Sequence, residues 1–127
     1  MSKKAFQADG TSVAGPYSQA VEVDGWVYLS GQVPMNFETG KLVSGSISEQ
    51  TAQVFDNLGR VLQAAGLGWE HVVKTTVFLT DMADFQEMNA TYQTFFQPPY
   101  PARSTIAVAA LPLGAQMEIE LVARRPA

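Results

Sequence analysis

Two predicted strands, at residues 72–80 and 104–111, carry apolar side chains on both of their faces. Alternate positions define the two faces: Val73, Thr75, Val77 and Leu79 against Val72, Lys74, Thr76 and Phe78 in the first strand, and Thr105, Ala107, Ala109 and Leu111 against Ser104, Ile106, Val108 and Ala110 in the second. A strand with one solvated face alternates apolar and polar residues, and neither of these strands does. We therefore expect both faces of the sheet to be covered.

The spacing of apolar residues predicts two helices. The first begins after Ser46, which fits a capping box together with Glu49. The second follows Asp81 or Asp84, either of which fits a helix cap, and it ends at the proline-rich residues 97–101. The apolar faces of the two helices consist of Thr51, Val54, Phe55, Leu58, Val61, Leu62 and Ala65, and of Phe85, Met88, Tyr92, Phe95 and Phe96.

Strands account for most of the remaining chain. Residues 21–23 and 26–31 are predicted to form a hairpin, because Asp24-Gly25 supplies the positive φ angles of a type I′ turn. Residues 36–46 contain two glycines and mostly polar side chains, so a surface loop is expected there. Further strands are predicted at residues 72–80, 104–111 and 116–124.

Two amphipathic helices pack most economically on one face of a single sheet. This arrangement is an α+β sandwich of two layers. The other face of the sheet has no consistent polar pattern and is most simply covered by another copy of the chain, so we expect a homo-oligomer. The length of 127 residues predicts one domain, spanning residues 1–127.

Charge and composition exclude several functions. The net charge is -4, and basic residues form no run longer than the pairs Lys3-Lys4 and Arg124-Arg125, so a nucleic-acid partner is not expected. No apolar run approaches the roughly 20 residues that span a bilayer, and none follows the two N-terminal lysines, which predicts a cytoplasmic protein without a membrane partner. The absence of cysteine excludes disulfides and thiolate chemistry.

The sequence offers little support for histidine, metal or cofactor chemistry. His71 is the single histidine and lies in a turn before a strand, where a structural or solvated role is expected. Asp81 and Asp84 bracket a helix start, where acidic residues are stabilising without a metal ion. A phosphate-binding glycine loop is absent. We therefore predict neither a metal nor a cofactor.

Arg103 is a candidate for binding a carboxylate. It follows residues 98–102 (PPYPA), a stiff segment that delivers the guanidinium at the start of a strand. A fixed guanidinium binds a carboxylate through two parallel hydrogen bonds, which lysine cannot match. An arginine at a strand edge also fits a solvated or ion-paired role, so this residue alone leaves both interpretations open.

Glu118 is a candidate for activating a water molecule. In the segment Met117-Glu118-Ile119-Glu120-Leu121 the three apolar residues are expected to face the helices, so both glutamates point to the opposite face. A carboxylate buried there is costly unless it has a partner. Both glutamates could lie at a solvated rim, or one of them could position and activate a water.

Five segments resemble the Rid/YjgF family in order and approximate spacing, and the match runs from about residue 7 to the C-terminus. These segments are Gly15-Pro16-Tyr17-Ser18-Gln19-Ala20, Leu29-Ser30-Gly31-Gln32-Val33-Pro34, Asn89-Ala90-Thr91-Tyr92, Pro101-Ala102-Arg103-Ser104-Thr105 and Glu118-Ile119-Glu120. The resemblance implies a chorismate-mutase-like subunit with a mixed sheet, a homotrimer, and sites between subunits.

The resemblance also implies an activity and a set of site residues. Active members of the family hydrolyse 2-iminobutanoate and 2-iminopropanoate to 2-oxo acids and ammonia without a cofactor. By position, Arg103 would bind the substrate carboxylate and Glu118 would hold the attacking water. Backbone groups of Gly31 and Thr105 would orient the substrate, and the cleft would be lined by Tyr17, Ser30, Phe85 and Asn89.

Two departures from the family pattern bear on substrate preference. Members of the family often have cysteine at the position of Thr105, and the segment between Asn89 and Arg103 is short compared with that of some relatives. The sequence leaves two other functions open: a regulatory or interaction protein that binds without turnover, and an endoribonuclease, which the acidic balance and the lack of an evident catalytic histidine disfavour.

Overall fold

The protein is described by a computed structural model that covers residues 2–127. Six strands form one sheet in the order β1-β2-β3-β8-β6-β7, in which only the β6–β7 pair is parallel. The sheet is therefore mixed, as expected. The strands are β1 (Lys4–Phe6), β2 (Ala20–Val23), β3 (Trp26–Gln32), β6 (Val72–Leu79), β7 (Ala102–Ala107) and β8 (Met117–Arg124), and a separate pair consists of β4 (Met35–Asn36) and β5 (Lys41–Leu42).

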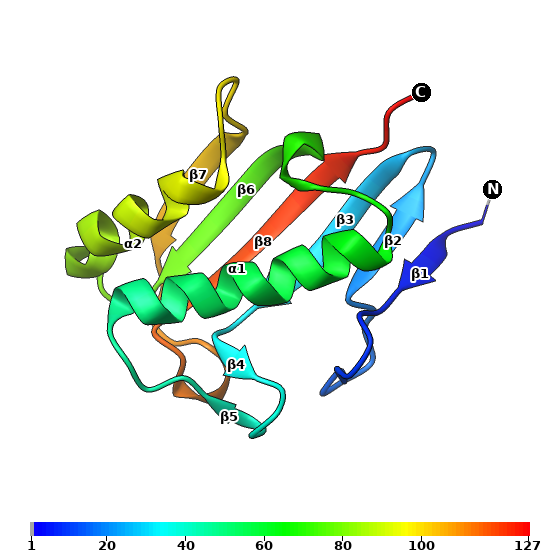
Figure 1. The fold of residues 1–127 in the computed structure, drawn as a ribbon. Helices are drawn as coiled ribbons and strands as arrows, with labels where there is room; N and C mark the ends of the chain where they lie inside the picture. Colours follow the sequence, from blue (N-terminus) through cyan, green and yellow to red (C-terminus); the bar gives the residue numbers. More distant parts are fainter. Residues whose placement is uncertain (1) are drawn as a thin grey trace.

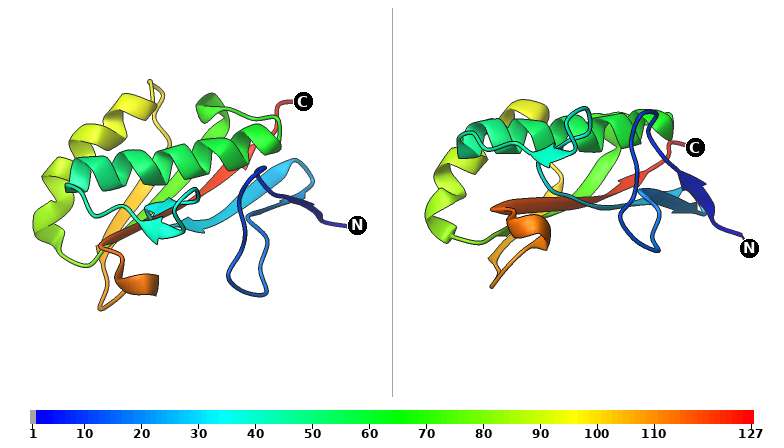
Figure 2. Two further views of the ribbon diagram at one scale, coloured as in Figure 1. Left: turned by 60° about the horizontal axis from the view of Figure 1, so that its bottom comes forward. Right: turned by 90° about the horizontal axis from the view of Figure 1, so that it is seen from below.

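Both α-helices lie on the same face of the sheet (Figures 1 and 2). They are α1 (Ile47–Ala64) and α2 (Phe85–Tyr92), with 3-10 turns η2 (Met82–Asp84) before and η3 (Gln93–Phe95) after α2. The right-hand view of Figure 2 shows the two layers, with the helices on one side of the strands. The two-layer α+β prediction is thus confirmed.

Local sequence signals account for where the elements begin and turn. The Ser46 hydroxyl accepts a hydrogen bond from the backbone N–H of Glu49, whose side chain in turn accepts from the N–H of Ser46, so the predicted capping box is present. Asp81 caps the turn before α2 by accepting from the N–H of Ala83. The β2–β3 hairpin turns at Asp24-Gly25, where both φ angles are positive.

The core fills the space between the helices and the sheet. Phe55 of α1 lies at its centre, with its ring stacked on that of Phe95 at 4.4 Å between centroids and meeting Tyr92 edge to face. Along β8, Met117, Ile119 and Leu121 are buried against the helices, whereas Glu118 and Glu120 point to the opposite side, as the strand alternation predicts.

Two strand predictions were wrong in detail. A β-bulge between Val72 and Lys74 shifts the phase of β6, so Val72 is buried and Val73 is 41% exposed, the reverse of the predicted assignment. Strand β7 ends at Ala107, so residues 108–111 are not part of the strand, although the N–H of Val108 still donates to the carbonyl oxygen of Leu79. Strand β1 and the β4–β5 pair were not predicted, because segments of two or three residues contain no measurable alternation.

The helix-free face of the sheet, called the open face below, is not covered by any other part of residues 2–127. Figure 2 shows only connecting segments, among them the turn near residue 113, projecting on this side. Its exposed large side chains include Trp26, Tyr28 and Ile106. This exposure agrees with the expectation that another copy covers the face. None of the described helices is long and apolar enough to cross a membrane.

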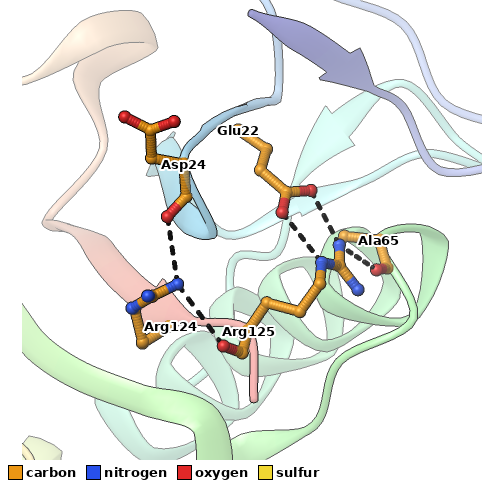
Figure 3. A network of polar contacts seen from close by, with 5 residues as sticks. All are labelled: Glu22, Asp24, Ala65, Arg124 and Arg125. Carbon is orange, nitrogen blue, oxygen red and sulfur yellow. Dashed lines mark hydrogen bonds and ion pairs between the residues drawn. The ribbon is translucent and has the colours of Figure 1, made fainter. Parts of the chain in front are cut away.

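An ion pair ties the end of β8 to β2 and α1 (Figure 3). The Arg125 guanidinium donates from Nε and Nη2 to the two carboxylate oxygens of Glu22, at 2.8 and 2.9 Å. Its Nη2 also donates to the carbonyl oxygen of Ala65 at 2.8 Å, which satisfies an acceptor at the C-terminal end of α1.

Candidate active site

Arg103 is held on the helix side of edge strand β7. Its backbone is paired with Thr75 of β6, and its Nη1 donates to the Asn89 side-chain oxygen on α2. The guanidinium carbon lies 4.7 Å from the centre of the Tyr92 ring and 5.5 Å from that of Phe85. Two aromatic rings and one amide therefore fix the guanidinium of a half-buried arginine.

Arg103 has no carboxylate partner among residues 2–127, where the only ion pair is that of Arg125 with Glu22. Its bond to Asn89 occupies one of five N–H donors. A hollow of about 430 Å³ beside the guanidinium is lined by Asn89, Tyr92, Gln93, Tyr100, Pro101 and Arg103. A fixed guanidinium with free N–H donors next to a hollow is suited to bidentate binding of an anion, through two parallel hydrogen bonds.

Glu118 lies on the open face of β8, directly against Gly31. A Cβ atom added to Gly31 would overlap the Glu118 carboxylate, so any other residue at position 31 would require the Glu118 side chain to move. Burial raises the pKa of the Glu118 carboxyl above its ordinary value, and the neighbouring Glu120 raises it further. A carboxylate whose pKa is raised accepts a proton more readily than an ordinary carboxylate.

A second hollow, of about 650 Å³, opens in front of Glu118. We call it the Glu118 hollow. Tyr17, Ser30 and Gly31 line it together with Glu120, Met35, Phe37 and Leu113. The Ser30 hydroxyl donates to the Ser18 carbonyl, which fixes the segment carrying Tyr17 against the end of β3.

One chain does not bring the eight predicted site residues together. Arg103 and Thr105 are paired in register with the core residues Thr75 and Val77, so they point to the helix side, where Phe85 and Asn89 also lie. Glu118 lies on the open face with the other hollow-lining residues, Tyr17, Ser30 and Gly31. Strand β6 separates the two groups in the sheet. A site that needs both Arg103 and Glu118 must therefore combine two chains.

Tyr92 supports Arg103 and was missed as a site residue by sequence reasoning, which placed it in the core. It is indeed buried, and its hydroxyl is hydrogen-bonded to that of Thr75 at 2.7 Å. The spacing of Phe85, Asn89 and Tyr92, four and three residues apart, puts them on one face of α2. That spacing was the signal in the sequence that could have indicated Tyr92 as a neighbour of the predicted site residues Phe85 and Asn89.

Other candidate residues have structural roles. His71 accepts a hydrogen bond at Nδ1 from the N–H of Gly68, which closes the 3-10 turn η1 (Trp69–His71), so the structural role predicted for it is confirmed. Thr105 Oγ1 is buried and has no hydrogen-bond partner among the described residues. Residues 2–127 contain no group of three or more acidic, histidine or cysteine side chains able to hold a metal ion.

Comparison with known proteins identifies relatives over nearly the whole chain. The family model described as Endoribonuclease L-PSP matches residues 8–125. A protein of Mus musculus named 2-iminobutanoate/2-iminopropanoate deaminase is 51% identical over 109 residues, which cover 86% of this chain and 81% of the mouse protein. A Homo sapiens protein of the same name is 47% identical over 116 residues, covering 91% of this chain and 85% of its own length.

Solved structures share the fold closely. RidA from the Antarctic bacterium Psychrobacter sp. PAMC 21119 superposes with a TM-score of 0.90 at 41% identity, covering 95% of this chain and 98% of its own. TdcF of E. coli, solved with bound serine, gives 0.91 at 35% identity, covering 97% and 99%. The sheet order and these structural relatives thus define a chorismate-mutase-like α+β protein. The chain belongs to the Rid/YjgF family, the family of the Endoribonuclease L-PSP model.

Proposed function

We propose that this chain hydrolyses 2-imino acids such as 2-iminobutanoate and 2-iminopropanoate to 2-oxo acids and ammonia. The names of relatives at about half identity support this activity. The observation that carries it is the half-buried Arg103 guanidinium, which is fixed by Asn89 and two rings but has no carboxylate of its own among residues 2–127. The substrate carboxylate would be its partner.

The proposed chemistry needs only an anchor, a water and a proton carrier. Arg103 binds the substrate carboxylate. The imine enters with its nitrogen protonated, and Glu118 accepts a proton from a water as the water oxygen attacks the imine carbon, which gives a neutral carbinolamine. Glu118 then returns this proton to the carbinolamine nitrogen. As the C–N bond breaks, Glu118 takes up the hydroxyl proton, so the 2-oxo acid forms and the nitrogen leaves as ammonia, which carries that proton away from Glu118 as ammonium. Orientation and a carboxylate of raised pKa account for the acceleration.

The site is proposed to form between copies of a homotrimer. The opposite placement of Arg103 and Glu118 on the sheet and the exposed apolar open face support this assembly. One copy would supply Arg103, Phe85, Asn89 and the Thr105 backbone. Its neighbour would supply Glu118 and the Gly31 backbone, with Tyr17 and Ser30 lining the cleft.

The activity is tested by adding the purified protein to a threonine dehydratase reaction. Formation of 2-oxobutanoate should exceed its spontaneous rate, and Arg103→Ala should abolish the increase. Absence of acceleration by wild type, or an undiminished rate for Arg103→Ala, would refute the mechanism. Incubating the same preparation with RNA examines the endoribonuclease alternative, which requires cleavage that is lost in Glu118→Ala.

The intersubunit arrangement is tested by mixing two inactive variants. Arg103→Ala and Glu118→Ala chains, unfolded together and refolded at equal ratio, should regain about one quarter of wild-type activity, because a random neighbour pair has both intact residues in one of four combinations. Each variant refolded alone is the control and should stay inactive. No recovery from a mixture that reassembles would place both residues in one chain's site.

A cytoplasmic location stays a prediction, which cell fractionation would test.

A further inference from the structure

Leu113 has a backbone conformation that is unfavourable for leucine. It lies in the turn η4 (Pro112–Gly114) between β7 and β8, with φ 61° and ψ 17°. This left-handed region brings the Cβ atom close to the following carbonyl oxygen, so it is usually occupied by glycine or asparagine. Hydrogen bonds from Gly114 to Leu111 and from Ala115 to Pro112 fix the turn.

Packing within the chain does not explain why a leucine occupies this position. Leu113 is 69% exposed, more than any other large hydrophobic residue that is exposed in residues 2–127, and it does not belong to the core. A glycine would relieve the crowding at no loss of buried area. The side chain is therefore favoured by something outside the chain's own core.

The position of Leu113 points to that role. It lines the Glu118 hollow, where Met35 and Phe37 provide further apolar surface. The turn projects on the open side of the sheet (Figure 2), the side to which Glu118 points. A substrate whose imine carbon lies beside a water held by Glu118 would lie at this hollow, so the hollow is available to its side chain.

We propose that Leu113 is a specificity-determining residue that, with Met35 and Phe37, receives the apolar side chain of a 2-imino acid. This inference rests on the proposed function. It predicts that lengthening an apolar substrate side chain strengthens binding, and that a polar or charged side chain of equal length binds less well, because it would lose water against these three residues.

The test compares Leu113→Gly and Leu113→Asn, both compatible with a positive φ, with wild type. The probes are 2-oxopropanoate, 2-oxobutanoate and 2-oxopentanoate as competitive inhibitors of the deaminase reaction. In wild type each added methylene should tighten inhibition about fourfold, the factor given by transfer of one methylene from water. In both variants this increment, the factor by which each added methylene tightens inhibition, should fall toward one. The inhibition constant of 2-oxopropanoate itself should stay within about twofold of the wild-type value.

Met82→Asn is the matched control, because Met82 is also an exposed apolar residue but lies outside the hollow. It should retain the wild-type increment. An unchanged increment in both Leu113 variants, with wild type active, would overturn this inference and leave the proposed function intact. Variants that keep the increment but elute as a smaller species would show instead that Leu113 is a contact between copies. If wild type does not accelerate imine hydrolysis at all, the proposed function itself fails.

Discussion

Replacing Arg125 by alanine should destabilise the fold by an amount that follows from the contacts in Figure 3. The change removes two bonds to Glu22 and one to the Ala65 carbonyl. The paired side chains are 34% and 17% exposed, so solvent screens the ion pair and about 1 kcal/mol is expected from it. The bond to the helix carbonyl adds about 0.5–1 kcal/mol. The total of about 1.5–2 kcal/mol corresponds to a fall in Tm of about 4–7 °C.

The loss should depend on pH in a defined direction. Hydrogen bonding to Arg125 lowers the pKa of Glu22 below its ordinary value. A carboxylate whose pKa is lower in the folded state contributes stability above its unfolded-state pKa and loses it as the pH falls through the folded-state pKa. The difference between wild type and Arg125→Ala should therefore be largest near neutral pH and shrink below about pH 4 toward the contribution of the bond to Ala65.

Denaturant unfolding at fixed protein concentration measures both effects. Glu22→Gln and the double variant with Arg125→Ala complete a thermodynamic cycle, in which the coupling energy should be about 1 kcal/mol at neutral pH. Arg125→Lys keeps the charge without the two-pronged geometry and should recover less than half of the loss. A coupling energy near zero at low salt would refute the assignment of an energetic role to this pair.

Three further predictions concern the site. Asn89→Ala should raise the KM for imino acids about 5–10-fold with little change in kcat, because Arg103 loses the bond that fixes it but keeps its charge; an unchanged KM would contradict this role. Thr105→Val should raise the free energy of unfolding by about 1 kcal/mol and retain activity, because it removes a buried hydroxyl that has no hydrogen-bond partner among the described residues. If denaturant unfolding shows a loss of stability instead, the hydroxyl is hydrogen-bonded. Glu120→Gln should move the acidic limb of the kcat/KM profile to lower pH, because Glu120 helps to raise the pKa of Glu118; a shift to higher pH would contradict this cause.

Local patterns predicted those parts of the fold that depend on near neighbours. The Ser46 capping box, the Asp24-Gly25 turn and the outward direction of Glu118 all follow from residues within a few positions of one another. The bulge that exposes Val73 does not, because it arises from the pairing of β6 with β8, two segments far apart in the sequence.

The arrangement of the site also depends on pairing between distant segments, which local patterns do not show. Arg103 was singled out for the stiff segment before it, but the face to which it points is set by the register of β7 against β6. Its contacts with Asn89 and Tyr92 depend on how α2 packs on that face. Leu113 gave no signal, because leucine is not typical of a positive φ and its residue type does not reveal the backbone angles of the turn. Sequence thus indicated which groups could act, and tertiary pairing determined which of them meet.

The placement of Arg103 and Glu118 on opposite faces of the sheet has a consequence for the kinetics of the protein. If every working site joins two copies, an isolated folded chain has both reactive groups and no turnover. Specific activity must then fall on dilution, and the rate must rise more steeply than in proportion to the total protein concentration wherever the assembly dissociates. Cells would obtain full activity only above a threshold of expression, set by the association constant of the subunits.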